Sequence, residues 1–181
     1  MWNDLIKTDN QILISINNSG TPFQDAFWLF ITNALNWIPF FALLLYIIFR
    51  FFPREKWKIL IFTLLSLFTT VLITNTTKEI VRRIRPLNDE LLLPYLRVIT
   101  PQNGYSFFSG HTSNSFAICI FLFLVFRQKM RWSFWIFVWA IPYSYSRLYL
   151  GVHFPSDVLV GMIVGTSVAY IYFRLYNRKH T

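Results

Sequence analysis

Long apolar segments alternate along the chain with short clusters of charge. A helix needs about 20 apolar residues to cross a bilayer, within a range of roughly 17 to 25. The first two apolar segments reach this length by themselves, whereas the last three need flanking residues to do so. Each of these three short segments could alternatively form a re-entrant or interfacial helix. The five segments are Ala26–Phe49, Ile59–Thr76, Ser113–Phe126, Trp132–Tyr145 and Val158–Phe173.

These segments predict an all-α, polytopic transmembrane bundle with about five spans, built as a single domain over residues 1–181. The stretch before the first segment differs from a span, because Lys7, Asp9 and Asn17 interrupt its apolar residues. It also lacks the basic start and continuous apolar core of a signal peptide. We therefore predict an N-terminal amphipathic helix at the membrane surface.

Prolines and glycines inside the apolar segments predict local features of the spans. Pro39 and Pro142 are expected to kink their helices, because proline removes a backbone donor. Gly161 and Gly165 form a Gly-x-x-x-Gly pair in the last segment. That spacing favours close packing against another helix.

Composition agrees with a membrane protein. Apolar residues make up 55% of the chain and charged residues only 14%, whereas soluble domains carry about 25% charged residues. The net charge of +9 could suggest nucleic acid, but the basic residues are divided among apolar segments and form no stripe for a groove, so we expect no nucleic-acid partner. Cys119 is the lone cysteine, which excludes an intrachain disulfide and favours a packing role.

The charge clusters predict the orientation of the spans. If all five segments cross, ten basic residues and one acid, Glu55, fall on one side. The positive-inside rule places that side and the C-terminus, with His180, in the cytoplasm. We expect an integral protein of a bacterial cytoplasmic (inner) membrane, with connections Thr77–Thr112 and Ser146–Asp157 on the periplasmic side. The basic residues are Arg50, Arg54, Lys56, Lys58, Arg127, Lys129, Arg131, Arg174, Arg178 and Lys179.

The two outward connections carry basic residues that the orientation rule does not require. Arginine pairs with phosphate oxygens through its planar fork, and lysine supplies a point charge. Ser109 and Gly110, just before an apolar segment, add a hydroxyl and backbone N–H groups at a positive helix end. This set predicts a phosphate site rather than simple attraction of lipid headgroups, and its basic members are Lys78, Arg83, Arg85 and Arg147.

Two histidines lie in the same connections. His153 and Asp157 are four residues apart, and Pro155 between them could begin a helix. An aspartate beside a histidine fixes the tautomer, so that the other ring nitrogen can attack. With His111 these residues offer at most three metal ligands among several cations. We therefore expect an anion site without a metal or other cofactor.

Three motifs resemble the type 2 phosphatidic acid phosphatase family, which is related to the vanadium haloperoxidases. Lys78 to Arg85-Pro86 fits K-x-x-x-x-x-x-R-P, and Ser146-Arg147 to His153 and Asp157 fits S-R-x-x-x-x-x-H-x-x-x-D. Ser109-Gly110-His111 fits P-S-G-H except that Phe108 replaces its proline. The order of the motifs is specific, and the apolar framework extends the resemblance over roughly Ala26 to Phe173.

The resemblance implies a metal-independent membrane hydrolase and a role for each matching residue. His153 would be the nucleophile with Asp157 as its partner, and His111 would protonate the leaving oxygen. The residues implied to hold phosphate are Lys78, Arg85, Ser109, Gly110 and Arg147.

Several substrates and two other functions fit the same residues. Undecaprenyl diphosphate is favoured by family analogy, and phosphatidylglycerophosphate, phosphatidic acid and a lipid A phosphate remain open. A non-catalytic protein that binds or transports lipid phosphates would need the cations but not both histidines and Asp157. A vanadate-dependent peroxidase could use the same anion pocket, although such proteins are mostly larger and soluble.

Overall fold

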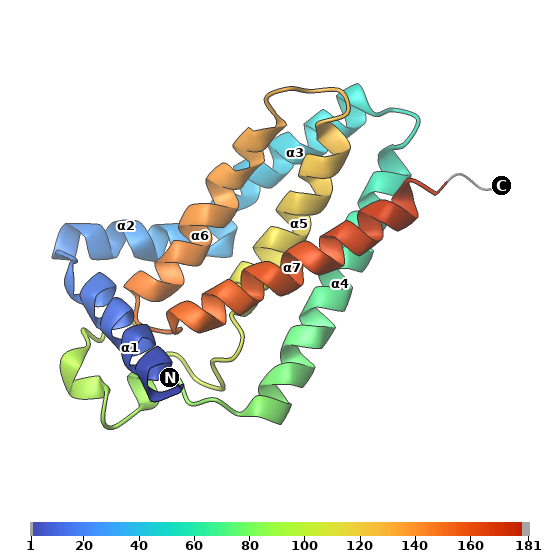
Figure 1. Cartoon of the computed structure of the whole chain (residues 1–181). Helices are drawn as coiled ribbons and strands as arrows, with labels where there is room; N and C mark the ends of the chain where they lie inside the picture. Colours follow the sequence, from blue (N-terminus) through green and yellow to red (C-terminus); the bar gives the residue numbers. More distant parts are fainter. Residues whose placement is uncertain (1, 179–181) are drawn as a thin grey trace.

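The computed structural model describes residues 2–178, which are helical and contain no strand; Lys179 and His180 lie outside them. Figure 1 shows the helices running roughly side by side, with α1 and α2 crossing one end of the bundle. The α-helices are α1 (Trp2–Asn18), α2 (Pro22–Thr32), α3 (Ile38–Phe51), α4 (Lys56–Val81), α5 (Gly110–Phe126), α6 (Phe137–Tyr149) and α7 (Pro155–Tyr176). The 3-10 turns are η1 (Ala34–Trp37), η2 (Pro86–Asn88), η3 (Leu93–Tyr95) and η4 (Ser133–Ile136).

Three helical stretches in the described chain are long and apolar enough to cross a membrane: 34–51, 56–88 and 155–176. The apolar helix α5 is shorter, and it lies among α4, α6 and α7. Phe121, Val125 and Cys119 on this helix have no exposed surface, which agrees with the packing role expected for the cysteine. The all-helical class is thus confirmed, whereas five spans and a membrane-surface location for α1 stay predictions.

The segment Ala26–Phe49 is not one continuous helix, and that detail of the prediction is wrong. Helix α2 ends at Thr32, and Asn33 has an extended backbone whose side chain accepts from the Leu35 N–H. The Trp37 indole donates to the Ile31 carbonyl at 2.8 Å, so the end of α2 is capped by polar groups that the apolar pattern hides.

The two prolines in the apolar segments have different positions in their helices. Pro39 lies in the first turn of α3, where its missing N–H costs little, so it begins a helix rather than kinking one. Pro142 is inside α6, as the sequence indicated.

The glycine pair of α7 packs directly on α5, which confirms the close approach predicted from its spacing. A β-carbon at Gly161 would come within 2.8 Å of the Ser109 carbonyl oxygen. One at Gly165 would lie 2.2 Å from the Ser113 carbonyl oxygen. Both obstacles are backbone atoms, so the helices could accept a side chain only by moving apart.

We expect Gly165→Ala to destabilise the protein, because overpacking costs about 1–3 kcal/mol. Thermal unfolding in detergent micelles measures the effect. Ser167→Ala, on the exposed face of the same helix, is the matched control and should unfold like the wild type. A Gly165→Ala protein that unfolds at the wild-type temperature would contradict the packing of α5 on α7.

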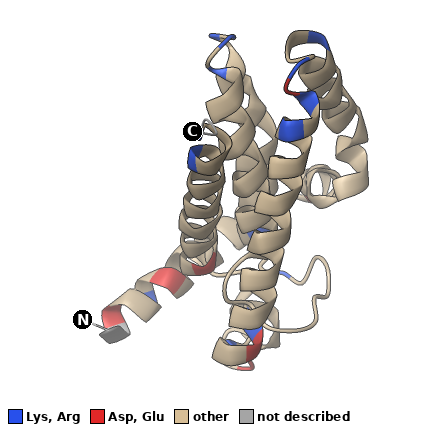
Figure 2. Ribbon diagram, turned by 90° about the vertical axis from the view of Figure 1, so that its right-hand side faces the viewer, with Lys and Arg blue, Asp and Glu red and all other residues tan. Residues whose placement is uncertain are grey.

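Charge is segregated along the bundle. Figure 2 shows blue basic segments at the end formed by the α3–α4 and α5–α6 connections, whereas most red acidic residues lie at or near the opposite end. Asp9, Asp25 and Asp157 belong to that opposite end, together with α1 and α2. The fold therefore keeps at one end two of the three basic clusters that the sequence assigned to one side of the membrane.

Candidate active site

His153 lies in the tight connection between α6 and α7 and is 1% exposed. Its Nε2 is 3.2 Å from Nη1 of Arg85, and its Nδ1 is 3.5 Å from a carboxylate oxygen of Asp157. Because a guanidinium only donates, the network assigns the lone pair to Nε2 and the proton to Nδ1. Burial, opposed by the interaction with Asp157, lowers the pKa of His153 to about 4, so the ring is neutral at pH 7.

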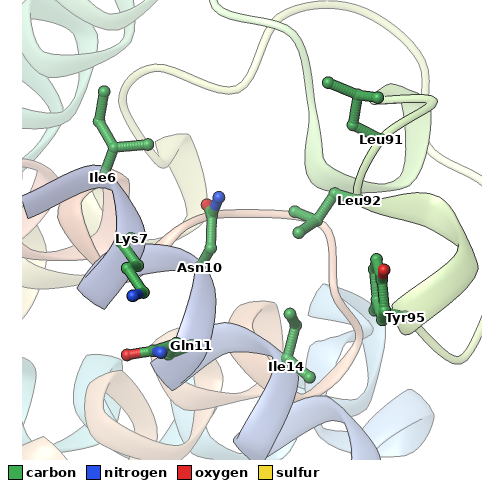
Figure 3. Close-up of a pocket in the computed structure, with 8 residues that line it drawn as sticks. All are labelled: Ile6, Lys7, Asn10, Gln11, Ile14, Leu91, Leu92 and Tyr95. Carbon is green, nitrogen blue, oxygen red and sulfur yellow. The ribbon is translucent and has the colours of Figure 1, made fainter. Parts of the chain in front are cut away.

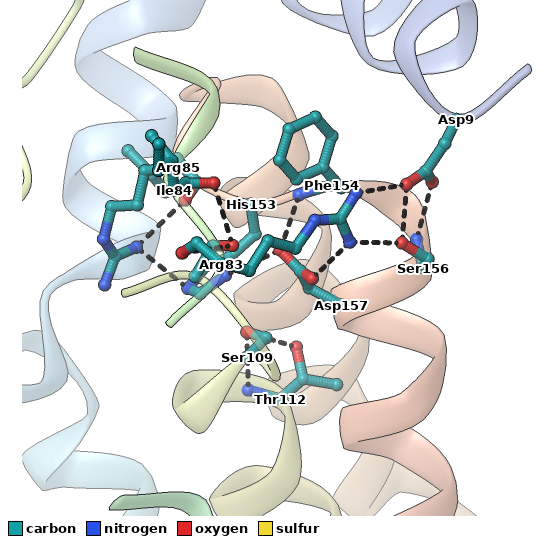
Figure 4. A network of polar contacts seen from close by, with 12 residues as sticks. Asp9, Arg83, Ile84, Arg85, Ser109, Thr112, His153, Phe154, Ser156 and Asp157 are labelled. Atoms are coloured by element: carbon teal, nitrogen blue, oxygen red, sulfur yellow. Dashed lines mark hydrogen bonds and ion pairs between the residues drawn. The ribbon is translucent and has the colours of Figure 1, made fainter. Parts of the chain in front are cut away.

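Asp157 stands in the first turn of α7 and has no exposed surface. Pro155 begins this helix, as the sequence suggested, and Oδ2 of Asp157 accepts the Phe154 N–H at 3.0 Å. Oδ1 accepts from Nη1 of Arg83 at 2.7 Å. The carboxylate is therefore held from two sides, with one oxygen left near the His153 ring (Figure 4).

Arg85 is buried and oriented by backbone carbonyls. Its Nε donates to the carbonyls of Asn103 and Gly104 at 3.1 and 3.2 Å, and Nη1 donates to that of Val152 at 2.9 Å. These carbonyls come from two loops that are distant in the sequence. The loops hold the guanidinium plane beside His153.

Arg147 approaches from α6 and is 2% exposed. Its Nη1 donates to the Thr32 hydroxyl at 2.6 Å, so the end of α2 fixes one side of the guanidinium. Its Nε is buried and has no hydrogen-bond partner among the described residues. A buried unpaired donor is costly, which suits a group that pairs with an anion.

The other predicted site residues converge on the same place. Lys78 of α4 interacts electrostatically with Arg85, Arg147 and Asp157, and His111 of α5 with Arg147, His153, Lys78 and Arg85. Ser109 and Gly110 start α5, and the Ser109 N–H donates to the Asp157 carbonyl at 3.1 Å. The other seven predicted site residues thus gather around the buried imidazole of His153, although the whole set comes from four helices and two loops.

Arg83 does not join this cationic group in the way the sequence suggested. Its guanidinium pairs with Asp157 and, at 2.9 Å, with Asp9 of α1. Figure 4 shows it on the side of Asp157 away from Arg85. Both terminal nitrogens pair with carboxylates, so the structure does not support the phosphate-binding role expected for Arg83 from the sequence.

Sequence reasoning missed several residues that support the site. Thr32 orients Arg147, and the Tyr143 ring stacks on that of His111 with centroids 4.9 Å apart. Asp9 and Ser156 bond to each other and to Arg83. The one signal in the sequence was weak, an acid among apolar residues at position 9.

A groove of about 460 Å³ lies elsewhere, between α1 and the segment Leu91–Tyr95 (Figure 3). Ile6, Ile14 and Leu92 give it apolar walls, and Lys7 stands at its side. It includes none of the predicted site residues, so we do not place the chemistry there.

Comparison with known proteins agrees with the family and the fold expected from the sequence. The PAP2 superfamily matches residues 56–181. A lipid A 4′-phosphatase of Bacteroides thetaiotaomicron is 33% identical over 174 residues, covering 91% of this chain and 75% of that protein. An undecaprenyl-diphosphatase of Sulfolobus acidocaldarius is 31% identical over 135 residues, covering 75% and 61%. A crystal structure of a transmembrane PAP2-type phosphatidylglycerolphosphate phosphatase from Bacillus subtilis shares the fold, with a TM-score of 0.76 at 23% identity, over 99% of this chain and 90% of the other.

Proposed function

Because this chain belongs to the PAP2 superfamily, we propose that His153 is the nucleophile of an integral membrane phosphatase that acts on a lipid phosphate or diphosphate. The enzyme class predicted from the sequence is confirmed by this membership. One observation carries the residue assignment: Nε2 of His153 faces Arg85 while Nδ1 faces Asp157. The attacking nitrogen is thereby directed to the place where cations would hold phosphate.

The proposed hydrolysis has two steps, transfer of the phosphoryl group to His153 and its release by water. Nε2 of His153 forms a bond to phosphorus while the bond to the leaving oxygen breaks, and His111 gives that oxygen a proton. Water then attacks phosphorus, returns a proton to His111, and the P–N bond breaks to release phosphate. Lys78, Arg85, Arg147, Ser109 and the Gly110 N–H offset charge on the transferring oxygens, which is the main source of rate in phosphoryl transfer.

Two substrate classes merit direct comparison. The lipid A 4′-phosphatase aligns with 91% of this chain, whereas the undecaprenyl-diphosphatase aligns with 75% of it. The longer alignment supports a phosphate monoester on a lipid A-like headgroup as the first substrate. Undecaprenyl diphosphate, preferred from the sequence, stays a prediction.

A phosphate-release assay on the purified protein tests the proposal. The panel holds lipid A, undecaprenyl diphosphate, phosphatidylglycerophosphate and phosphatidic acid, each with and without EDTA. We expect release from at least one lipid and no loss with the chelator, because cations outnumber possible ligands around His153. Activity that EDTA removes and one divalent ion restores would contradict the site as drawn.

We further propose that the site faces the periplasm across a bacterial inner membrane, in a single domain. The cluster of cytoplasmic charge supports this orientation. Cysteines at exposed positions 88 and 128, in a Cys119→Ala background, test it. Asn88→Cys should react with an impermeant thiol reagent in spheroplasts and Gln128→Cys only after lysis. The reverse pattern would place the chemistry on the cytoplasmic leaflet.

A further inference from the structure

Helix α1 is anchored beside the proposed active site by buried contacts. Leu13 has no exposed surface and packs with Leu92 and Phe154. Asn17, also fully buried, donates to the Tyr149 carbonyl at 2.9 Å and accepts the Arg97 N–H at 2.6 Å. These contacts fix the side chain of Asp9, one turn before Leu13, against the start of α7 (Figure 4).

Asp9 completes the first turn of α7. The N-cap position of that helix is Phe154, whose side chain cannot accept a hydrogen bond, so the turn lacks an ordinary cap. Oδ1 of Asp9 accepts the Ser156 N–H at 2.8 Å, and Oδ2 accepts from the Ser156 hydroxyl at 2.5 Å. A carboxylate at a helix N-terminus is also favoured by the helix dipole.

The same carboxylate fixes Arg83. Oδ2 of Asp9 pairs with Nη2 at 2.9 Å, while Nη1 is shared between the Ser156 hydroxyl and Oδ1 of Asp157, each at 2.7 Å. The guanidinium also lies over the Phe154 ring, 3.8 Å from its centroid. Because Asp9 takes one of its two terminal nitrogens, Arg83 presents a single nitrogen to Asp157.

This arrangement has a consequence for the His153–Asp157 pair. A guanidinium freed from Asp9 could turn and take both oxygens of Asp157 in the bidentate geometry that arginine prefers. The oxygen 3.5 Å from Nδ1 of His153 would then be drawn away from the imidazole. An imidazole without its carboxylate loses both its orientation and the support of the positive charge that forms as it attacks.

We infer that Asp9 is a positioning residue for phosphoryl transfer: through Arg83 and Ser156 it keeps Asp157 directed at His153. Asp9 touches neither phosphate nor the imidazole. The inference rests on the proposed function, and it makes the N-terminal helix, which lies outside the matched family region 56–181, part of the catalytic unit.

Asp9→Asn tests the inference, with p-nitrophenyl phosphate as the probe in detergent micelles. Misplacement of a reacting group costs roughly 10- to 100-fold in rate, so we expect kcat to fall by that factor with KM little changed. Arg83→Gln should cause a similar loss. The double variant should lose no more than either single one, because residues of one network are not additive.

Asp25→Asn is the matched control. Asp25 of α2 forms the same kind of contact at the same end of the bundle, pairing with Arg97 at 2.5 Å and accepting from Tyr149 at 2.6 Å, but it bonds to none of Arg83, Ser156 and Asp157. Asp25→Asn should lower the unfolding temperature about as much as Asp9→Asn does, while its kcat stays near that of the wild type.

Equal loss of kcat in Asp9→Asn and Asp25→Asn, or additive losses with Arg83→Gln, would overturn the inference. If Asp9→Asn does not fold, Ser156→Ala removes one link of the network, and an unchanged kcat in that variant overturns it as well. Wild-type turnover that His153→Ala abolishes establishes the proposed function separately. A failure of the Asp9 inference is thus distinct from a failure of the phosphatase assignment.

Discussion

His153→Ala is expected to abolish phosphate release from every substrate, with a loss of about 10⁴-fold or more, because a nucleophile cannot be replaced by the groups that merely bind. Rapidly quenched wild-type protein, kept away from acid, should carry phosphohistidine, and the variant should carry none. The measurement is phosphate release together with ³²P labelling from a labelled substrate. His180→Ala supplies a histidine control and should retain wild-type turnover.

The pH profile adds a second readout for the same residue. Since the pKa of His153 is lowered to about 4, the attacking nitrogen stays unprotonated well below neutrality. We expect the acid limb of kcat/KM, which reports the free enzyme, near that pH rather than near the ordinary histidine value of about 6.5. The lowered pKa also makes the stability of the fold depend on pH. The free energy of unfolding is highest above about pH 6.5 and decreases as the pH falls toward 4, because the unfolded chain then binds a proton more tightly than the buried ring does.

Near-normal phosphate release by His153→Ala would contradict the assignment of His153 as the nucleophile. It would favour a protein that only binds lipid phosphates, the release then coming from a contaminating enzyme in the assay. Retained binding without turnover is the expected outcome, because Lys78, Arg85 and Arg147 remain. Unfolding of the variant should stay cooperative, because Arg85 and Asp157, the neighbours of His153, keep other hydrogen-bond partners.

His111→Ala is expected to reveal the leaving group. A lipid alkoxide needs a proton as it departs, whereas nitrophenolate leaves without help, and a general acid contributes about 10² to 10⁴ in rate. The variant should therefore lose far more activity on an alkyl phosphate lipid than on p-nitrophenyl phosphate. A diphosphate lipid should fall between them, because its leaving phosphate is of intermediate basicity. The kcat/KM values for the three substrates, relative to wild type, are the measurement.

Equal loss on all three substrates would show that His111 binds phosphate rather than donating a proton. Tyr143→Phe is the matched control, because it keeps the ring that stacks on His111 and removes only the hydroxyl. That variant should leave the ratio between substrates unchanged. A changed ratio would mean that the tyrosine hydroxyl, not the imidazole, supplies the proton.

Much of the site could be predicted because its motifs are local. The interval from Lys78 to Arg85 spans the end of α4, and Ser109 caps α5 as a serine before an apolar helix should. Pro155 starts α7 and so sets the spacing of His153 and Asp157. Each of these features depends on residues within a few positions of one another, where backbone geometry leaves few alternatives.

The partner of Arg83 could not be predicted in the same way. Within its motif Arg83 is equivalent to its basic neighbours, and only the turn of the chain after α4 decides that it faces Asp9 and Asp157 instead of phosphate. The break at Asn33 was hidden for a related reason, because side-chain caps end α2 within a run that is apolar enough to continue.

The sequence by itself determined the membrane class, the helical bundle, the glycine contact in α7 and the set of residues that we propose to carry the chemistry. Hydrophobic periodicity, the placement of charges and short motifs predict these properties, because each property follows from the preference of individual residues for their immediate surroundings. Only the tertiary structure decided that α1 reaches the active site and that Asp9 shares an arginine with Asp157. Contacts between residues 74 positions apart depend on how helices dock, and docking is set by the packing of many side chains at once rather than by any one of them.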